Sequence, residues 1–304
     1  MTLHPDVVVI GDALLDVTAH PETAIRSGAD VPARIRIGCG GQGANLAVRL
    51  ARRGARAELV CALGDDPGGT LVRHALAAEG VSLSSVRADA TGTVVILLDQ
   101  RGERTMLSHR APFAAEAAAA VRADVAWLVL SGYLLLEPDA SVLASALATV
   151  PARRALVGCT VPDELAGSWA NAAAALRPDL VVLNQDEAVA LIRDVREADS
   201  LPARLADWLG SAVVVTDPAG ATARLDGRSA AVRAPESLPA TDTAGAGDAF
   251  AAALVGSLLG SRWPPPAGAL EAALEASIEL ASAVAHAFGA QARVAGERDA
   301  VLRP

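Results

Sequence analysis

Residues 241–250 read Thr-Asp-Thr-Ala-Gly-Ala-Gly-Asp-Ala-Phe, and an apolar run from Ala251 to Leu259 follows at once. The apolar run predicts a helix, so the turn before it lies at the positive end of a helix dipole. Gly245 and Gly247 allow successive N–H groups to point at one spot, beside Asp248 on the first helical turn. An anion site next to a carboxylate suits moving a phosphoryl group onto a hydroxyl. A glycine-rich turn whose aspartate only caps a helix is the structural alternative.

Charge and composition exclude several classes of function. The 304 residues carry a net charge of −9 and no basic stripe interleaved with aromatic residues, so nucleic acid is not an expected partner. The chain has no lysine, which excludes a Walker P-loop and Schiff-base chemistry. The three cysteines form no pattern, and neither a signal peptide nor an uninterrupted membrane-spanning run is seen. We therefore predict a cytoplasmic protein that binds no membrane.

Short apolar runs alternate with helical patterns along most of the chain. The predicted strands are 6–10, 57–62, 125–130, 155–158, 180–183 and 212–216, and the main predicted helices are 68–79, 139–149, 163–176, 185–194, 200–209 and 267–287. Because buried strands joined by helices form a parallel sheet covered on both faces, we predict a doubly wound α/β fold in one domain, 1–304. Two polar β segments, about 12–38 and 91–110, break the alternation and predict a small sheet that acts as a lid.

Candidate ligand groups follow the first predicted strand. Asp12 and Asp16 come just after it, and ligands of open α/β sheets bind beyond the carboxyl ends of the strands. Carboxylates accept hydrogen bonds from sugar hydroxyls, although each aspartate could equally lie in a solvated turn. Gly40 and Gly41 allow a ligand to approach the backbone, and Asn45 offers both a donor and an acceptor.

Two later strand ends carry further candidates. Asn184 and Glu187 combine an amide with a carboxylate, which can hold hydrated Mg²⁺, or can simply cap a helix. The turn from Thr216 to Gly220 could contact nucleotide phosphates through the threonine hydroxyl and backbone N–H groups. Pro218 removes one donor from that turn.

Two segments resemble the signatures of the ribokinase-like (PfkB) carbohydrate kinases. Residues 40–54 read Gly-Gly-Gln-Gly-Ala-Asn-Leu-Ala-Val-Arg-Leu-Ala-Arg-Arg-Gly, and residues 242–250 read Asp-Thr-Ala-Gly-Ala-Gly-Asp-Ala-Phe. The resemblance covers essentially the whole chain. It implies a doubly wound, mainly parallel sheet flanked by helices, with a small β-sheet lid. It also implies transfer of the ATP γ-phosphoryl group to a hydroxymethyl group of an unphosphorylated sugar, a ribose-like pentose or a ketohexose, with Mg²⁺ and K⁺ as candidate cofactors.

The resemblance also implies roles for individual residues. Asp248 is the expected general base, and the backbone of Gly245, Ala246 and Gly247 is the expected anion hole. The expected sugar contacts are Glu137 and five residues already introduced as ligand candidates: Asp12, Asp16, Gly40, Gly41 and Asn45. The expected nucleotide contacts are Asn184, Thr216, Gly220, Gly245 and Gly247, with Glu187 near Mg²⁺ through water and Asp242 near a monovalent cation.

Three positions depart from the family pattern. The loop from Thr216 to Gly220 is one residue shorter than the family's Thr-x-Gly-x-x-Gly and has Pro218 where a glycine is expected. Gln42 stands where ribokinases and kinases of phosphorylated sugars commonly carry lysine, which argues against a phosphorylated acceptor. Arg34, Arg36 and Arg104 of the lid are the residues that could replace that positive charge. Arg293 stands where some members carry a serine close to the K⁺ site.

Two other functions remain open at this point. A nucleoside kinase of the adenosine or pseudouridine type would use aromatic stacking, for which Phe113 and Tyr133 are the candidates. A non-catalytic regulator that binds a sugar or a nucleotide could keep the same fold. The resemblance also implies that the chain can form a homodimer through its lid.

Overall fold

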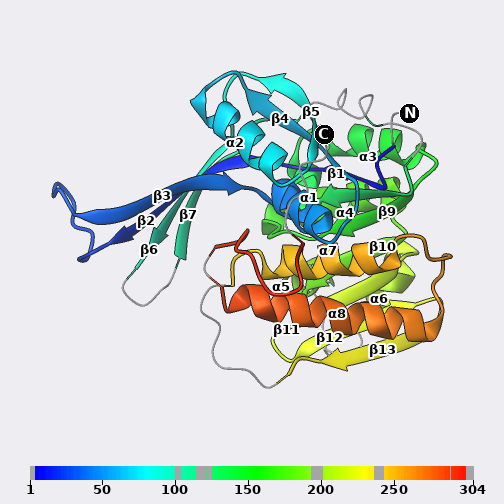
Figure 1. Cartoon of the computed structure of the whole chain (residues 1–304). Helices are drawn as coiled ribbons and strands as arrows, with labels where there is room; N and C mark the ends of the chain where they lie inside the picture. The colour runs from blue at the N-terminus through cyan, green and yellow to red at the C-terminus, as the bar shows by residue number, and fades with distance from the viewer. Residues whose placement is uncertain are drawn as a thin grey trace.

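The computed structural model describes residues 4–99, 104–113, 121, 125–192, 201–235, 243–287 and 289–298. The larger of its two sheets contains β1 (Val7–Ile10), β4 (Ala57–Gly64), β5 (Ser82–Ala88), β8 (Trp127–Ser131), β9 (Arg153–Val157), β10 (Leu180–Asn184), β11 (Ala212–Asp217), β12 (Gly220–Leu225) and β13 (Arg228–Arg233). The strand order is β13-β12-β11-β10-β9-β8-β1-β4-β5 (Figure 1). The parallel strands are β11, β10, β9, β8, β1, β4 and β5, and β12 and β13 add an antiparallel edge.

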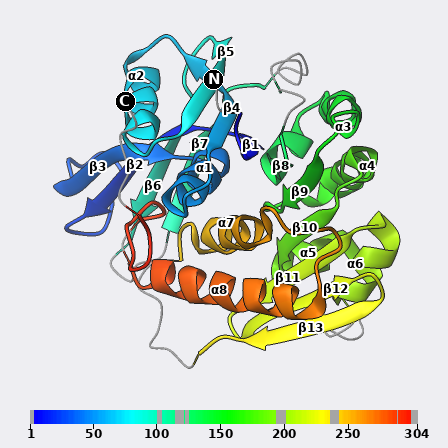
Figure 2. The ribbon, with the colours of Figure 1, turned by 45° about the vertical axis from the view of Figure 1, so that its right-hand side comes forward.

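Helices cover both faces of this sheet, because successive residues of each buried strand point to opposite sides. Val7 and Val9 pack in one core, and Val8 and Ile10 pack in the other. The first core is covered by α1 (Gln42–Arg52), α2 (Pro67–Ala78), α7 (Ala246–Leu258) and α8 (Ala267–Ala285), and the second by α3 (Ala140–Ala148), α4 (Ala166–Leu176), α5 (Gln185–Ile192) and α6 (Leu201–Leu209) (Figure 2). The short 3₁₀ helices are η2 (Gly132–Leu136) and η3 (Asp163–Leu165).

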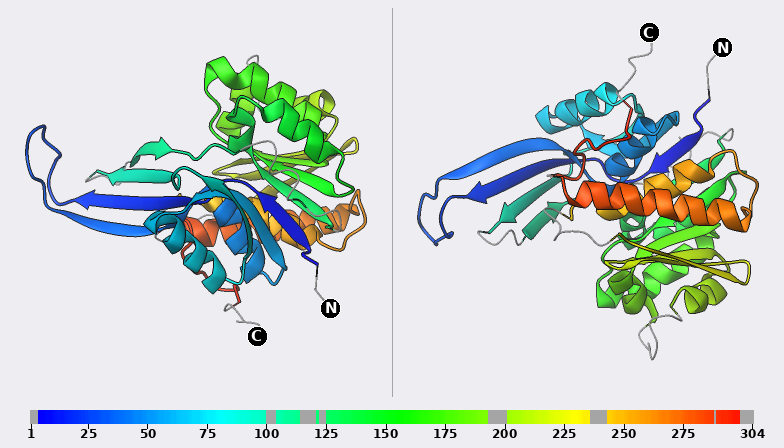
Figure 3. Two further views of the ribbon diagram at one scale, coloured as in Figure 1. Left: turned by 90° about the horizontal axis from the view of Figure 1, so that it is seen from above. Right: turned by 60° about the horizontal axis from the view of Figure 1, so that its bottom comes forward.

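The smaller sheet contains β2 (Leu14–Pro21), β3 (Ala33–Gly40), β6 (Thr93–Leu98) and β7 (Arg104–His109), in the order β3-β2-β6-β7. It projects from the main body, as both views of Figure 3 show. The predicted doubly wound α/β class with a small second sheet is therefore confirmed. Residues 100–103, between β6 and β7, lie outside the described residues.

The sequence analysis missed β5 and the β12–β13 hairpin. β5 reads Ser-Leu-Ser-Ser-Val-Arg-Ala and is partly exposed at the edge of the sheet, so it carries no continuous apolar run. The hairpin lies at the opposite edge and is built mainly from alanine, glycine and arginine. Within the described ranges, no helix is both long and apolar enough to span a membrane.

Candidate functional site

The anion turn, Thr243–Gly247, lies at the start of α7. Gly245 has φ +73°, a left-handed conformation that favours glycine, and an added Cβ would lie 2.8 Å from Cα of Ala290. The N–H of Ala246 donates a long hydrogen bond of 3.3 Å to the carbonyl of Thr243. Within the described residues the N–H groups of Gly245 and Gly247 donate to no protein acceptor. The turn therefore leaves amides at a helix N-terminus available to an anion.

Asp248 lies half-buried on the first turn of α7. Its Oδ2 accepts a 2.8 Å hydrogen bond from Nδ2 of Asn45. Burial, reinforced by the charge of Asp12, raises the pKa of Asp248 to about 6, and the Asn45 hydrogen bond and the charge of Arg49 act in the opposite direction. The carboxylate is thus ionised at neutral pH but more basic than an exposed aspartate.

The start of α1 places Asn45 opposite Asp248. Gly41, the residue before the helix, has φ +94°, and a Cβ there would lie 2.7 Å from the carbonyl oxygen of Asp12. That carbonyl accepts a 3.0 Å hydrogen bond from the N–H of Ala44. The loop after β1 and the first turn of α1 therefore pack backbone against backbone.

Asp12 forms an ion pair with Arg110, whose side chain comes from the end of the second lid segment. Its Oδ1 also accepts weak hydrogen bonds from the N–H of Gly43 at 3.3 Å and from Oγ of Ser131 at 3.4 Å. The guanidinium of Arg110 stacks on the Tyr133 ring, with its Cζ 3.7 Å from the ring centre. Asp12 therefore holds the positively charged side chain of Arg110 at the carboxyl end of β1. The sequence analysis did not assign Arg110 a role, because only its spatial neighbours reveal one.

A small pocket next to this ion pair includes Asp12, Arg110, Phe113, Tyr133 and Glu137 in its lining. Burial raises the pKa of Glu137, and the charge of Arg110 lowers it. The structure therefore brings two of the predicted sugar-binding acids, Asp12 and Glu137, to one pocket.

Asp16 and Gly40 lie on neighbouring lid strands. A Cβ at Gly40 would lie 1.9 Å from Oδ2 of Asp16, so only a glycine leaves room for this carboxylate. Burial, together with the charge of Asp12, raises the pKa of Asp16 to about 6, and Arg110 lowers it. No hydrogen bond reaches the Asp16 carboxylate from the part of the chain that the structure describes. A half-buried carboxylate without a protein donor is suited to accepting a hydrogen bond from a ligand hydroxyl.

The side chain of Gln42 is hydrogen-bonded to the ends of two neighbouring strands. Its Nε2 donates to the carbonyl of Gly158 at 2.8 Å. Its Oε1 accepts from Oγ of Ser131 at 2.7 Å and from the N–H of Gly132 at 3.1 Å. The side chain therefore joins the ends of β8 and β9 to the start of α1, and it adds no positive charge to the site.

Asn184 and Glu187 form a reciprocal cap at the start of α5. The N–H of Asn184 donates to Oε2 of Glu187 at 2.9 Å, and the N–H of Glu187 donates to Oδ1 of Asn184 at 2.8 Å. Burial raises the pKa of Glu187 to about 7. The helix cap that the sequence left as an alternative is thus formed. Among the described residues, no three His, Cys, Asp or Glu side chains are placed to bind a metal ion.

The predicted nucleotide loop is the tight turn between β11 and β12. Oδ1 of Asp217 accepts from the N–H groups of Ala219 at 2.6 Å and Gly220 at 2.9 Å. A Cβ at Gly220 would lie 2.1 Å from the carbonyl oxygen of Val232, so packing in the hairpin already requires a glycine. Thr216 is the strand partner of Asn184 in the β10–β11 ladder. The two predicted nucleotide contacts are therefore neighbours, and the turn's own amides are bonded to Asp217.

Two other segments reach the anion turn. Nη2 of Arg104, in lid strand β7, donates to Oγ1 of Thr243 at 2.7 Å. Ala290, in the segment Gly289–Arg298, packs directly on Gly245. The predicted cation ligand Asp242 lies outside the described residues.

Comparisons with known proteins agree with this arrangement. The family model described as pfkB family carbohydrate kinase matches residues 4–294. A fructokinase of Klebsiella pneumoniae is 30% identical over 296 residues, which cover 86% of this chain and 87% of that protein. A fructokinase of Salmonella typhimurium is 29% identical, with 98% of both chains covered. The structure of Arabidopsis thaliana ribokinase complexed with ribose and ATP superposes with a TM-score of 0.75, 22% identity and 95% of each chain covered. The chain therefore belongs to the pfkB family of carbohydrate kinases and is a phosphotransferase.

Proposed function

We propose that this kinase transfers the γ-phosphoryl group of ATP to a hydroxymethyl group of an unphosphorylated ketohexose such as D-fructose, with a ribose-like pentose as the second choice. One observation carries the proposal: the Asp248 carboxylate, oriented by Asn45, lies directly beside the anion turn. Two relatives that match most of this chain are fructokinases, which supports the ketohexose. The solved ribokinase complex with ribose and ATP supports the pentose and the nucleotide.

In this proposal the protein acts mainly by positioning the reactants and stabilising their charges, and it does little covalent chemistry. Asp248 accepts the proton of the acceptor hydroxyl, and the amides of Gly245, Ala246 and Gly247 stabilise the charge of the transferred phosphoryl group. The transition state of phosphoryl transfer is loose, so alignment of the acceptor with the γ-phosphate provides most of the acceleration. The sugar hydroxyls bind Asp12, Asp16, Asn45 and Glu137, close to the backbone of Gly40 and Gly41.

The residues present fit hydrated Mg²⁺, because Glu187 offers a half-buried carboxylate and Mg²⁺ needs few direct protein ligands. Bound with the nucleotide, Mg²⁺ would neutralise phosphate charge. Asn184, Thr216 and Gly220 would lie along the nucleotide. Asp242 and the segment Gly289–Arg293 are the proposed site for a monovalent cation such as K⁺.

Two observations favour a neutral sugar over the other acceptors. The Gln42 side chain is neutral and is hydrogen-bonded within the protein at both its amide nitrogen and its oxygen. Arg110 is already paired with Asp12, so neither residue provides an unpaired positive charge for an acceptor phosphate. A nucleoside base would need an open aromatic face. Arg110 covers the Tyr133 ring, and Phe113 is only 7% exposed.

ADP release measured with MgATP and a panel of D-fructose, D-ribose and adenosine tests the proposal. We expect turnover with D-fructose to be highest, and K⁺ to increase it relative to Na⁺. Highest turnover with adenosine would establish the nucleoside kinase instead. Binding of a sugar and ATP without release of ADP on any acceptor would establish the non-catalytic regulator.

We also propose that the chain works as one domain and that a second copy covers its lid. Cross-strand neighbours on one face of the lid are Ile37, Val17, Val95 and Leu107, followed by Ile35, Ala19 and Leu97. Ile35, Ile37 and Leu107 are 58–61% exposed. Asp16 alternates with these residues along β2 and so lies on the opposite face, toward the sugar. An apolar face of this kind, with the ligand on the other side, suits lid-to-lid packing in a homodimer.

A further inference from the structure

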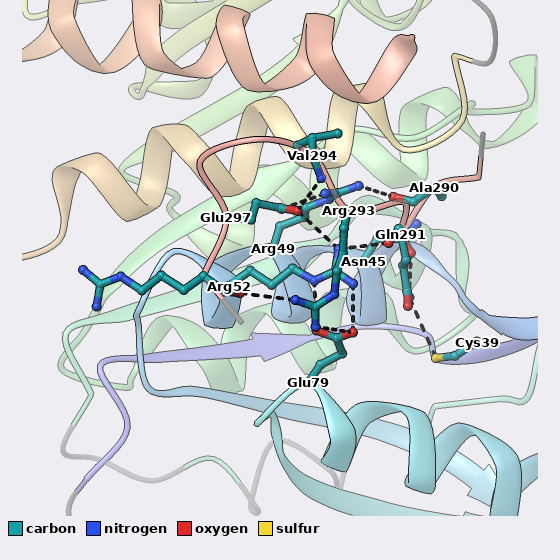
Figure 4. Close-up of polar contacts among 11 residues, drawn as sticks. Cys39, Asn45, Arg49, Arg52, Glu79, Ala290, Gln291, Arg293, Val294 and Glu297 are labelled. Atoms are coloured by element: carbon teal, nitrogen blue, oxygen red, sulfur yellow. Dashed lines mark hydrogen bonds and ion pairs between the residues drawn. The ribbon is translucent and has the colours of Figure 1, made fainter. Parts of the chain in front are cut away.

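Buried charges fasten the segment Gly289–Arg298 to helix α1. Nη1 of Arg49 lies 2.6 Å from Oε1 of Glu297, and its Nη2 donates to the carbonyl of Ala290 at 2.8 Å (Figure 4). The side chains of Arg49 and Glu297 are 0% and 2% exposed. The ion pair is therefore fully enclosed, and its geometry fixes both ends of the segment.

A second arginine on α1 holds the middle of the segment. Nη1 of Arg52 donates to the carbonyl of Gln291 at 2.9 Å and lies 3.4 Å from Oε2 of Glu297. Its Nε and Nη2 each bind Glu79, at the end of α2, at 2.9 Å. Arg293 completes the group, with Nη2 3.0 Å from Oε2 of Glu79. We name these five residues, Arg49, Arg52, Glu79, Arg293 and Glu297, the C-terminal clasp.

The clasp presents the side chain of Gln291 to the candidate site. Nε2 of Gln291 donates to Oδ1 of Asn45 at 3.0 Å, with Sγ of Cys39 3.9 Å away as a weaker acceptor (Figure 4). Nδ2 of the same Asn45 amide donates to Oδ2 of Asp248 at 2.8 Å. An amide has an oxygen on one side and an NH₂ on the other, so binding its oxygen turns the NH₂ toward Asp248.

We propose that Gln291 is a positioning residue, which orients Asn45 toward Asp248 and is itself held in place by the C-terminal clasp. The inference rests on the proposed role of Asp248 as general base. It gives the segment Gly289–Arg298 a function in catalysis at a distance from the acceptor hydroxyl. It also explains why this chain buries charged groups at Arg49 and Glu297, since the segment must be held firmly enough to fix one amide.

A double-mutant cycle tests whether Gln291 acts through Asn45. Gln291→Leu keeps most of the side-chain volume and removes the donor. With D-fructose and MgATP we expect it to lower kcat about tenfold while KM for the sugar changes less than about twofold. In an Asn45→Ala background, the same Gln291→Leu change should alter kcat less than about twofold. Equal losses in both backgrounds, or no loss in the first, would overturn the proposal.

Gln291→Glu and Cys39→Ala complete the set. A glutamate at 291 accepts a hydrogen bond from Nδ2 of Asn45 and turns the amide oxygen toward Asp248, so we expect a larger loss of kcat than with leucine. Cys39→Ala removes only the other partner of the Gln291 amide, so its kcat should match that of the original chain. Thermal unfolding of each variant shows whether it is folded. A loss with Cys39→Ala as large as that with Gln291→Leu would contradict the Asn45 route.

A nuclear magnetic resonance titration separates this inference from the choice of acceptor. The ¹⁵N side-chain amide of Asn45 should follow the ionisation of Asp248 in the original chain, whatever sugar is phosphorylated. The charged groups around Asp248, namely Asp12, Glu187 and Arg49, stay unchanged in Gln291→Leu. Loss of the donated hydrogen bond should move the titration midpoint to higher pH. Identical midpoints would overturn the positioning role, whereas an original chain inactive on D-fructose would overturn only the acceptor assignment.

Discussion

On the sugar side of the site, charged and amide side chains bond to one another, whereas on the nucleotide side the amides are either unengaged or bonded within a turn. Asp248 is bonded to Asn45, and Asp12 is paired with Arg110. On the nucleotide side, Gly245 and Gly247 offer amides, but those of Ala219 and Gly220 are bonded to Asp217. The sugar side is thus organised mainly by side-chain contacts, with the Asp16 carboxylate as the exception, and the nucleotide side depends on backbone conformation.

Substitutions on the two sides should therefore act in different ways. A change on the sugar side breaks a side-chain network and alters the chemistry of one group. A change in the anion turn acts through the backbone, so it depends on whether a new Cβ can be accommodated.

Asp248→Asn should produce the largest effect. It keeps the shape of the side chain and removes the proton acceptor, so we expect kcat to fall by roughly 10²–10⁴-fold while KM for the sugar stays within a few-fold. Initial rates of ADP release give both constants. The control is Asp226→Asn in the exposed β12–β13 turn, which should leave them unchanged. Near-normal turnover by Asp248→Asn would remove the general base from the mechanism.

Gly245→Ala should come next, with a loss of about 10²–10³-fold in kcat. Its φ of +73° strains any other residue, and the new methyl group would lie 2.8 Å from Ala290. The anion turn must therefore move, which displaces its amides from the phosphate. Gly268→Ala, in α8 with open space around the added Cβ, is the matched control. If both variants retained full activity with ATP, the turn would not be the phosphoryl site.

The pH dependence should give a smaller, graded effect. Burial raises the pKa of Asp248 to about 6, and ionised Asp248 is the active form, so kcat/KM should fall about tenfold per pH unit below pH 6. Burial also raises the pKa of Asp16 to about 6, so both carboxyl groups titrate in the same pH range. Asp16→Asn should raise KM and keep the acidic limb. If kcat/KM of Asp16→Asn no longer fell below pH 6, the fall would be due to Asp16 and not to Asp248.

Substitution of the lid should change kcat least, by a few-fold. Ile37→Asp places a charge in the apolar face that we propose to be covered by a second copy, so the homodimer should dissociate at micromolar concentration. Light scattering coupled to gel filtration measures the mass directly. Val142→Asp, at a 62% exposed position on α3, is the control. A monomeric original chain, or an Ile37→Asp variant that stays dimeric, would contradict the lid interface.

Much of the architecture could be predicted because it depends on local patterns. The run Val7–Ile10 is apolar at every position, as a strand buried on both faces requires, and the glycines before Gln42 and Ala246 mark the two helix starts. β5 and the β12–β13 hairpin were missed because edge strands need no continuous apolar run.

Several features of the site depend on contacts that no local pattern encodes. Arg49 and Glu297 are 248 positions apart, and Asn45 and Gln291 are 246 apart. Arg110 looks like any exposed arginine until the fold places it between Asp12 and Tyr133. Asn184 and Glu187 show the opposite case, since their spacing predicted the cap, while a metal ligand role depends on a nucleotide.

The most direct test of the central claim is a crystal structure with D-fructose and a non-hydrolysable ATP analogue. We predict a sugar hydroxymethyl oxygen about 2.6–3.2 Å from the Asp248 carboxylate, with the terminal phosphate against the amides of Gly245 and Gly247. A sugar bound away from Asp248, or a terminal phosphate away from the anion turn, would contradict the account.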